Sequence, residues 1–447
     1  MNQKDITAEG LRVEIGFPSA VMLVIGGIIG VGIFVNPAVV AHGLTSESLV
    51  LLAWTLGGVI ALLGAFVYAE LAARMPNTGG EYVYLRNTYG PLAGFLFGWT
   101  TLLVVQAGGM AAVTIVFARN LNVLAGGALS ERVVVVATLT GLAAINCLGV
   151  KSGNGVQGLL GVLKVLAIVA LILTGLFFVP QIGFKAAAAA AGPADSLKSF
   201  GAAMIPVVFS YGGWQTANYV AGEIRNPARN LARALLVGVI AVISIYLLVN
   251  IACVRALGVT QLGATLTPAS DVLERAAGPV GGALAASAIA LSAIAYLSQA
   301  MLTGPRVYFA MARDGLFFRQ VAQVADSSHV PVIAIVLQAV WTGFLALSGS
   351  YDQILSYVTS MNFLFFGLSA SCLFVLRRRD RAAGRQANMY LAPLHPWSTG
   401  LFVLACAIIV GVSFWAYPVN SLIGYAIMLI GVPPYLYWRK QTQRDPI

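Results

Sequence analysis

The sequence predicts an all-α polytopic membrane protein with about twelve transmembrane helices. Composition is the first reason, because 59% of the 447 residues are hydrophobic and 9% are charged, against about 25% charged in an average soluble domain. Such a small number of charges cannot cover the surface of a soluble protein. Lipid must therefore cover most of the surface of this one. The second reason is a series of apolar stretches of about 20 residues, the length that a helix needs to cross a bilayer.

The clearest apolar stretches are spread along the whole chain. They are residues 48–72, 159–179, 234–253, 331–347, 400–415 and 421–437. The other predicted spans contain more glycines, which transmembrane helices tolerate. Between spans, the Thr-Pro-Ala-Ser-Asp start within 260–277 predicts a short amphipathic outer helix, and the Ala-rich residues 184–196 predict an outer loop.

Lys and Arg residues are unevenly distributed, which is the third reason. With the N-terminus inside, most of the 26 Lys and Arg residues fall in loops on the inner side. Those predicted on the outer side are Arg119, Arg132, Lys185, Lys198, Arg255 and Arg275. An excess of Lys and Arg in cytoplasmic loops is the positive-inside rule. The net charge of +10 therefore reports topology and does not indicate a nucleic-acid partner.

Residues typical of enzymes and metal sites are scattered. Histidine occurs near loops, without a cysteine or carboxylate at ligand spacing, at His42, His329 and His395. Cysteine occurs in apolar runs, where a thiol behaves as a small hydrophobe, at Cys147, Cys253, Cys372 and Cys406. No P-loop and no nucleophile elbow is present. The sequence therefore predicts neither an enzyme nor a bound metal or cofactor.

Two spans are interrupted by glycines in a similar way. The first reads Val-Ile-Gly-Gly-Ile-Ile-Gly-Val-Gly-Ile-Phe at 24–34, and the sixth reads Val-Phe-Ser-Tyr-Gly-Gly-Trp-Gln-Thr at 208–216. Each glycine within a helix costs about 1 kcal/mol relative to alanine, so unwinding is easy here. The alternative is that Gly26, Gly30 and Gly108-Gly109 are small residues that pack against neighbouring helices.

The spacing of the two interrupted spans favours a binding site. They lie five helices apart, which indicates an inverted repeat with a site near the bilayer midplane. Unwound backbone is tolerated there only where it lines a cavity. Amide groups at a half-helix N-terminus suit a carboxylate, and freed carbonyls suit an ammonium group. Together they predict a site for a zwitterion, that is, for an amino acid.

Six sequence segments resemble a known family across nearly the whole chain. They are Gly-Ile-Ile-Gly-Val-Gly-Ile-Phe (27–34), Tyr-Ala-Glu-Leu (68–71), Thr-Gly-Gly-Glu-Tyr (78–82), Phe-Ser-Tyr-Gly-Gly-Trp (209–214), Glu-Ile-Arg-Asn-Pro-Ala-Arg-Asn-Leu (223–231) and Val-Ser-Phe-Trp (412–415). In these the chain resembles the amino acid–polyamine–organocation (APC) superfamily, and within it the bacterial relatives of the L-type (light-subunit) amino acid transporters. The resemblance implies a LeuT-like 5+5 inverted repeat with helices 1 and 6 broken.

The predicted division follows that repeat. A cytoplasmic N-terminal tail is expected at 1–16, a single transmembrane domain at 17–438 and a cytoplasmic C-terminal tail at 439–447. Within the domain, repeat one is expected at about 17–180, repeat two at about 199–377 and helices 11 and 12 at about 398–438. The location implied is the bacterial inner (plasma) membrane.

The resemblance also implies a function. It is sodium-independent secondary transport of amino acids by alternating access, as an exchanger of neutral L-amino acids, because the pocket segments contain no acid to meet a cationic side chain. A proton-coupled importer or a carrier of cationic amino acids or amines stays open. From a different class, an amino-acid sensor or a channel stays open as well.

Substrate-binding residues are carried over from the family position by position. The amides of Val31, Gly32 and Ile33 are expected to hold the carboxylate. The carbonyls of Ile28, Phe209, Ser210 and Gly212 are expected to hold the ammonium group, with the Phe209 ring as a gate. Gly109, Gln215 and Asn362 are expected to line the side-chain pocket. Phe209 as an ordinary packing residue is the alternative.

Lys164 lies in an otherwise apolar span, where a charge costs about 2.5–3.5 kcal/mol. By resemblance it takes the place of sodium and bonds the carbonyls of Gly26 and Ile29, with Tyr246 and Ser292 as its other partners. Snorkelling to the inner interface is the alternative.

Two departures from the family pattern concern substrate and partner. Val31 stands where many relatives have Ser or Thr, and residues 123–132 lack the cysteine that links some relatives to a heavy subunit. We therefore expect no disulfide-linked heavy subunit.

Carboxylates at inner helix ends form a last group. We expect them either to be solvated or to close an inner gate as the pairs Glu70–Arg74, Glu81–Arg86 and Glu223–Arg233.

Overall fold

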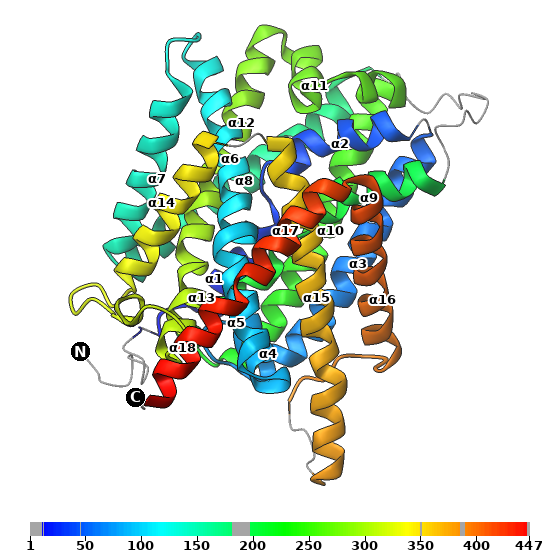
Figure 1. Ribbon diagram of the computed structural model, residues 1–447. Helices are drawn as coiled ribbons and strands as arrows, with labels where there is room; N and C mark the ends of the chain where they lie inside the picture. Colours follow the sequence, from blue (N-terminus) through cyan, green and yellow to red (C-terminus); the bar gives the residue numbers. More distant parts are fainter. Residues whose placement is uncertain are drawn as a thin grey trace.

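The structure is a computed structural model that describes residues 11, 13–44, 46–180, 197–348, 351–384 and 389–444. Within these residues the regular structure is helical, apart from an isolated β-bridge between Ile15 and Ile224. Figure 1 shows the long helices running side by side between two faces of the molecule, with α4 and the end of α15 at one face and α11 at the other. The all-α prediction is confirmed.

The first part of the chain forms the elements that surround the first break. They are α1 (Phe17–Ile28), α2 (Gly32–Gly43), α3 (Glu47–Arg74), α4 (Glu81–Tyr89), α5 (Pro91–Thr100), η2 (Thr101–Val105), α6 (Gln106–Leu124), α7 (Glu131–Cys147), α8 (Val150–Leu173) and η3 (Thr174–Phe178).

The second part of the chain begins with the other broken helix. Its elements are α9 (Leu197–Ser210), η5 (Trp214–Glu223), α10 (Pro227–Ala264), α11 (Pro268–Ala277), α12 (Pro279–Thr303), α13 (Pro305–Arg313), η6 (Arg319–Ala322), α14 (Val332–Ser348), α15 (Tyr351–Ala382), α16 (Trp397–Ala416), α17 (Pro418–Ile430) and α18 (Val432–Arg444).

Nine segments of the described chain are long and apolar enough to cross a membrane. They are Phe17–Gly43, Glu47–Arg74, Pro91–Leu124, Gly158–Phe178, Pro227–Ala264, Pro279–Arg313, Val358–Ala382, Trp397–Ala416 and Pro418–Thr442. A shorter apolar helix, Val332–Ser348, accompanies them. Large apolar side chains on their outer surfaces are exposed, including Val340 at 67% and Phe177 at 72%, which suits lipid as the surrounding solvent. The total of twelve spans stays a prediction.

Both predicted helix breaks are present. α1 ends at Ile28 and α2 begins at Gly32, whereas α9 ends at Ser210 and η5 begins at Trp214. Gly213 adopts a left-handed φ of +106°, a conformation that favours glycine because it has no Cβ. A Cβ on Gly213 would lie 2.0 Å from the carbonyl oxygen of Gly27. The two breaks therefore touch through glycine backbone. Packing of small residues between intact helices, the alternative for these glycines, does not predict a contact between two breaks.

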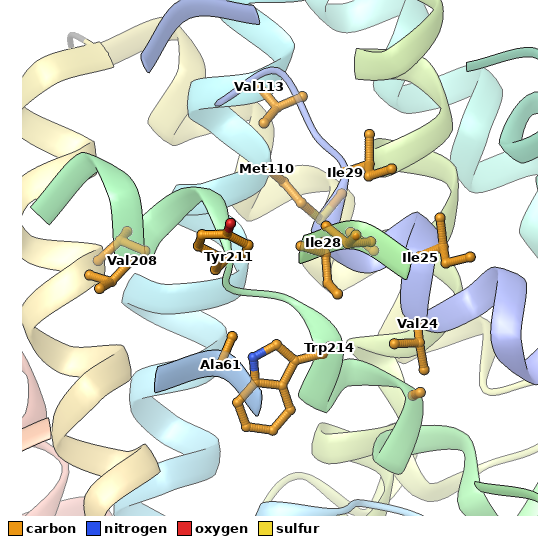
Figure 2. Packing of buried hydrophobic residues seen from close by; sticks show 14 of the residues in the cluster. Val24, Ile25, Ile28, Ile29, Ala61, Met110, Val113, Val208, Tyr211 and Trp214 are labelled. Carbon is orange, nitrogen blue, oxygen red and sulfur yellow. The ribbon is translucent and has the colours of Figure 1, made fainter. Parts of the chain in front are cut away.

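Figure 2 places both breaks among buried apolar side chains. Ile28 ends α1 and Ile29 follows it, and Tyr211 and Trp214 flank the second break; all four are at most 4% exposed. The Trp214 ring packs edge-on against Tyr68 of α3, with ring centroids 4.7 Å apart. The irregular backbone is therefore held by packing on neighbouring helices.

Residues of both predicted tails take part in the described structure. Ile15 lies within the predicted N-terminal tail, yet its amide donates to the Glu223 carbonyl at 3.0 Å and its carbonyl accepts from the Arg225 amide at 2.9 Å. α18 continues to Arg444, beyond the predicted boundary at 438. The short helix predicted within 260–277 is present as α11, its place on the outer side stays a prediction, and the predicted loop at 184–196 lies outside the described residues.

Candidate functional site

A small cavity of about 60 Å³ lies between the two breaks. It is lined by Gly27, Ile28, Gly30, Val31, Gly32, Val105, Gln106, Gly109, Val113, Phe209, Ser210, Gly212, Gly213, Gln215, Thr216, Tyr296, Val358 and Asn362. None of these lining residues carries a charge at neutral pH. Backbone and neutral polar groups therefore supply the site's electrostatics.

Two half-helix ends meet at the cavity. α2 starts at Gly32, and its N-cap residue, Val31, makes no side-chain capping bond. The first amide groups of a helix have no partner within it, and they carry a partial positive charge. At the other break α9 ends at Ser210, and the last turn of a helix leaves carbonyls without intrahelical partners. The Phe209 carbonyl, expected to face the ligand, already accepts from the Gly212 amide at 3.0 Å. The arrangement offers donors for an anionic group beside acceptors for a cationic one.

The structure brings most of the predicted substrate residues together. Those that line the cavity are Ile28, Val31, Gly32, Gly109, Phe209, Ser210, Gly212, Gln215 and Asn362. Ile33 is the exception, since its side chain is buried in α2 and it does not line the cavity. The Ile28 carbonyl, expected to face the ligand, already accepts a hydrogen bond from the Tyr246 hydroxyl at 3.1 Å.

Asn36 fastens α2 to α9 beside the cavity. Its Nδ2 donates to the Ser210 Oγ at 2.7 Å and to the Pro206 carbonyl at 3.1 Å. A Cβ on Gly32 would lie 3.0 Å from the Ser210 Oγ and 3.2 Å from the Asn36 Nδ2. A large side chain at Gly32 would therefore enter the contact between the half-helices.

Several lining residues were not predicted from the sequence. Tyr296 of α12 places its hydroxyl 3.3 Å from where a Cβ on Gly109 would lie. Thr216 donates to the Gly213 carbonyl at 2.7 Å and accepts from Gln299 Nε2 at 2.8 Å. Tyr296 and Gln299 lie in α12 among other polar residues such as Ser298, and no motif marks them. Polarity within a predicted span is the signal that could have identified them.

Lys164 of α8 bonds the unwound end of α1. The side chain is fully buried, and its Nζ donates to the Gly26 carbonyl at 2.9 Å and to the Ile29 carbonyl at 2.5 Å. Snorkelling is therefore wrong as the account of Lys164. Tyr246 and Ser292 were expected to be partners of Lys164, but they do not bond it. They donate instead to the neighbouring carbonyls of Ile28 and Gly30 at 3.1 and 2.9 Å. The correction has a simple reason, because a broken helix frees several successive carbonyls.

Below the cavity, a fully buried ion pair joins η5 to α13. Arg306 donates to Glu223 through Nε at 2.8 Å and through Nη2 at 3.1 Å, and both side chains are 0% exposed. The predicted partner of Glu223, Arg233, is not the observed one. Arg233 follows Glu223 closely in sequence, whereas Arg306 reaches it only because the tertiary structure packs α13 against η5.

Glu70 of α3 lies at the centre of a second charged group. It pairs with Arg74 at 2.7 Å, as predicted, and with Arg377 of α15 at 2.5 Å. It also accepts from the Ala392 amide at 2.7 Å. Arg74 pairs in addition with Asp380. These contacts tie α3 to the far end of α15.

Glu81 and Arg86, predicted to pair, do not. Arg86 pairs with Asp314, which also accepts from the Tyr82 hydroxyl at 2.5 Å. Glu81 instead accepts from the hydroxyls of Tyr68 at 2.7 Å and Tyr219 at 3.0 Å. Five positions along one turn and a half of α4 separate Glu81 from Arg86, and they place the two side chains on different faces.

Within the described residues, no group of three or more His, Cys, Asp or Glu is placed to hold a metal ion. The four cysteines are free thiols, and all but Cys147 are buried.

Comparison with known proteins agrees with this architecture. A family model described as "Amino acid permease" matches residues 15–434. The chain is 31% identical to the serine/threonine exchanger SteT of Bacillus subtilis over 440 residues, covering 97% of this chain and 98% of that protein. It is 31% identical to the large neutral amino acids transporter small subunit 2 of mouse, covering 97% and 83%. It is 29% identical to the mouse Asc-type amino acid transporter 1, with the same coverage. The chain is therefore a multi-pass membrane protein that belongs to the amino acid permease family of the APC superfamily, among the relatives of the L-type transporters.

Proposed function

We propose that this protein is a sodium-independent secondary transporter that exchanges neutral L-amino acids by alternating access. The carrying observation is the cavity between two helix breaks, where the amides at the start of α2 lie beside the carbonyls at the end of α9. A zwitterion needs both kinds of group within a few ångströms of each other. A bound amino acid would place its carboxylate on the amides of Val31 and Gly32, and its ammonium group on carbonyls of the second break.

A neutral side chain is favoured by the rest of the lining. A cationic side chain buried in the cavity would need a carboxylate, and the lining residues include none. Gly109, Tyr296 and Gln215 border the remaining space, which mixes a hydroxyl, an amide and bare backbone. Two of the relatives named above are an exchanger and a transporter whose names specify serine/threonine and large neutral amino acids. We infer a neutral substrate of small to moderate size.

Sodium independence is inferred from Lys164. The ammonium group takes two carbonyls of the unwound segment, which are the kind of oxygen ligands that a sodium ion would use. Tyr246 and Ser292 occupy the two carbonyls between and after these. A fixed charge thus replaces a bound cation. We further propose that both termini lie on the cytoplasmic side of the bacterial inner membrane and that no disulfide-linked subunit is attached.

The test is uptake of labelled amino acids into proteoliposomes in sodium-free buffer, with and without unlabelled amino acid inside. We expect uptake only when amino acid is present inside. Uptake into empty vesicles driven by an inward proton gradient would instead make the protein a proton-coupled importer. Uptake restricted to arginine, lysine or amines would contradict the neutral-substrate proposal, and no uptake at all would favour a sensor.

Two variants test the site within that assay. Gly32→Val should abolish exchange, because its side chain would meet Ser210 and Asn36. Gly141→Ala is the matched control, since a Cβ at Gly141 meets nothing within 4 Å. Exchange by Gly32→Val at the wild-type rate would contradict the carboxylate site.

A further inference from the structure

Glu81 is a fully enclosed carboxylate whose hydrogen bonds come from hydroxyl groups. It begins α4 and is 1% exposed. Tyr68 of α3 donates to its Oε1 at 2.7 Å, Tyr219 of η5 donates to its Oε2 at 3.0 Å, and Ser369 of α15 lies 3.5 Å from Oε1. One carboxyl group thus joins three elements from distant parts of the sequence. We call Glu81, Tyr68, Tyr219 and Ser369 the Glu81 cluster.

No basic side chain neutralises Glu81 among the described residues. The arginines of the same region are engaged elsewhere: Arg306 with Glu223, Arg74 and Arg377 with Glu70, and Arg86 with Asp314. The other titratable groups that face the carboxyl are Tyr84 of α4, Cys372 of α15 and Cys406 of α16. Those phenols and thiols are neutral near pH 7. The charge of Glu81 is therefore balanced by dipoles, those of the hydroxyl groups and that of the N-terminal end of α4, and not by a cation.

The Glu81 cluster lies between the cavity and the face of the molecule that carries α4. Along η5, Thr216 lines the cavity, Tyr219 holds Glu81 one turn later, and Glu223 reaches Arg306 at the end. These three contacts follow η5 away from the cavity in that order. Positive-inside placement of the loops makes this face the cytoplasmic one. For a ligand to leave toward that face, η5 must separate from α3, and the bonds to Glu81 must break.

Two opposing effects act on the protonation of Glu81 in this closed arrangement. Burial disfavours the charged carboxylate, whereas the three hydroxyl donors favour it. Burial outweighs the hydroxyl groups and raises the pKa of Glu81 to about 7. The neutral acid is also easily accommodated, because a tyrosine hydroxyl can turn to accept the new O–H.

Linkage sets the direction of the effect. When the gate opens and water reaches Glu81, its pKa returns toward the ordinary value of about 4.3. The closed gate thus binds the proton more tightly than the open gate. Adding a proton stabilises the closed gate, and removing it favours opening, because the carboxylate is better solvated in water.

We propose that Glu81 is a regulatory proton-binding site that holds the inner gate closed when protonated and releases it when ionised. The proton comes from cytoplasmic water and returns there, so it is not carried across the membrane. The proposal rests on the proposed function, since a gate requires alternating access. Protonation of Glu81 then makes transport slower in an acidic cytoplasm.

The experiment is amino acid exchange in proteoliposomes with equal pH inside and outside, from pH 5.5 to 8.5. For the wild type we expect exchange to rise with pH, with a midpoint near 7 and a change approaching tenfold per unit on the acid side, as for one proton. Glu81→Gln mimics the neutral acid, so its exchange should stay at the low, acid-side rate at every pH. Glu274→Gln on the exposed surface of α11 is the control and should keep the wild-type profile.

Tyr219→Phe provides a second test that keeps the carboxyl group. Removal of a hydroxyl donor disfavours the carboxylate, so the midpoint should move to higher pH. A flat wild-type profile, a Glu81→Gln profile equal to the wild type, or an unmoved Tyr219→Phe midpoint would each overturn the proton site while leaving the exchanger intact. Absence of exchange in the wild type at every pH would instead refute the proposed function.

Discussion

Replacement of Lys164 is the perturbation whose consequence the structure defines most fully. Lys164→Met keeps most of the length and apolar character of the side chain but removes the ammonium group. The carbonyls of Gly26 and Ile29 then lose the donor that holds them at 2.9 and 2.5 Å. Both carbonyls lie in a fully buried region around α1. The unwound segment loses the contact that fixes it to α8.

The magnitude follows from the two lost bonds. A buried polar group left unsatisfied costs about 1–3 kcal/mol, so two carbonyls cost roughly 2–6 kcal/mol in the arrangement that forms the site. Each 1.4 kcal/mol corresponds to a factor of about ten in population. We therefore expect exchange by Lys164→Met to fall at least about tenfold, even where the protein is still folded.

The assay is sodium-free exchange in proteoliposomes with equal amounts of inserted protein, together with thermal unfolding in detergent. Lys198→Met is the matched control, because Lys198 is exposed and contacts the Trp415 ring at 5.2 Å. Exchange by Lys164→Met at the wild-type rate would refute the reasoning and leave Lys164 with a structural role only. Restoration of exchange in Lys164→Met by added sodium would support the idea that the ammonium group replaces a cation.

Three further outcomes are expected. Gly213→Ala should abolish exchange, since its Cβ would lie 2.0 Å from the Gly27 carbonyl at a φ of +106°; retention of activity in that variant, with Gly411→Ala as control, would contradict the contact between the breaks. Arg306→Met should destabilise the protein by about 3–5 kcal/mol because it leaves the Glu223 charge buried alone, and the double variant with Glu223→Gln should recover much of the loss in thermal unfolding. Asn36→Ala should weaken exchange severalfold by releasing α2 from Ser210 and Pro206, and an unchanged apparent affinity and rate would show that this link is dispensable.

The broken helices could be predicted because their cause is local. Glycines at 26, 27, 30 and 32 and at 212 and 213 weaken helix propensity wherever they occur, and a membrane tolerates such backbone only beside a cavity. Most of the substrate residues followed from the matching motifs, and they line one cavity in the structure. Their role in binding an amino acid stays a prediction.

The ionic partners could not be predicted in the same way. Glu70–Arg74 is an i,i+4 pair on one helix, and sequence spacing alone indicates it. Glu223–Arg306 and Glu70–Arg377 join residues far apart in the chain. Proximity in sequence wrongly suggested Arg233 for Glu223, because the chain between two helices does not reveal which helices pack together. It wrongly suggested Arg86 for Glu81, because the two side chains lie on different faces of α4.

By itself, the sequence determined that the chain spans a membrane as helices, that Lys and Arg are concentrated in some of its loops, and where two helices unwind. Those properties depend on composition, loop charge and local backbone preference, and each is readable from short segments. The tertiary structure decided which groups meet: the Gly27–Gly213 backbone contact, the carbonyls that Tyr246 and Ser292 take, and the three hydroxyls around Glu81. Such contacts depend on the packing of helices distant in sequence, where a shift of a few ångströms makes or breaks a hydrogen bond.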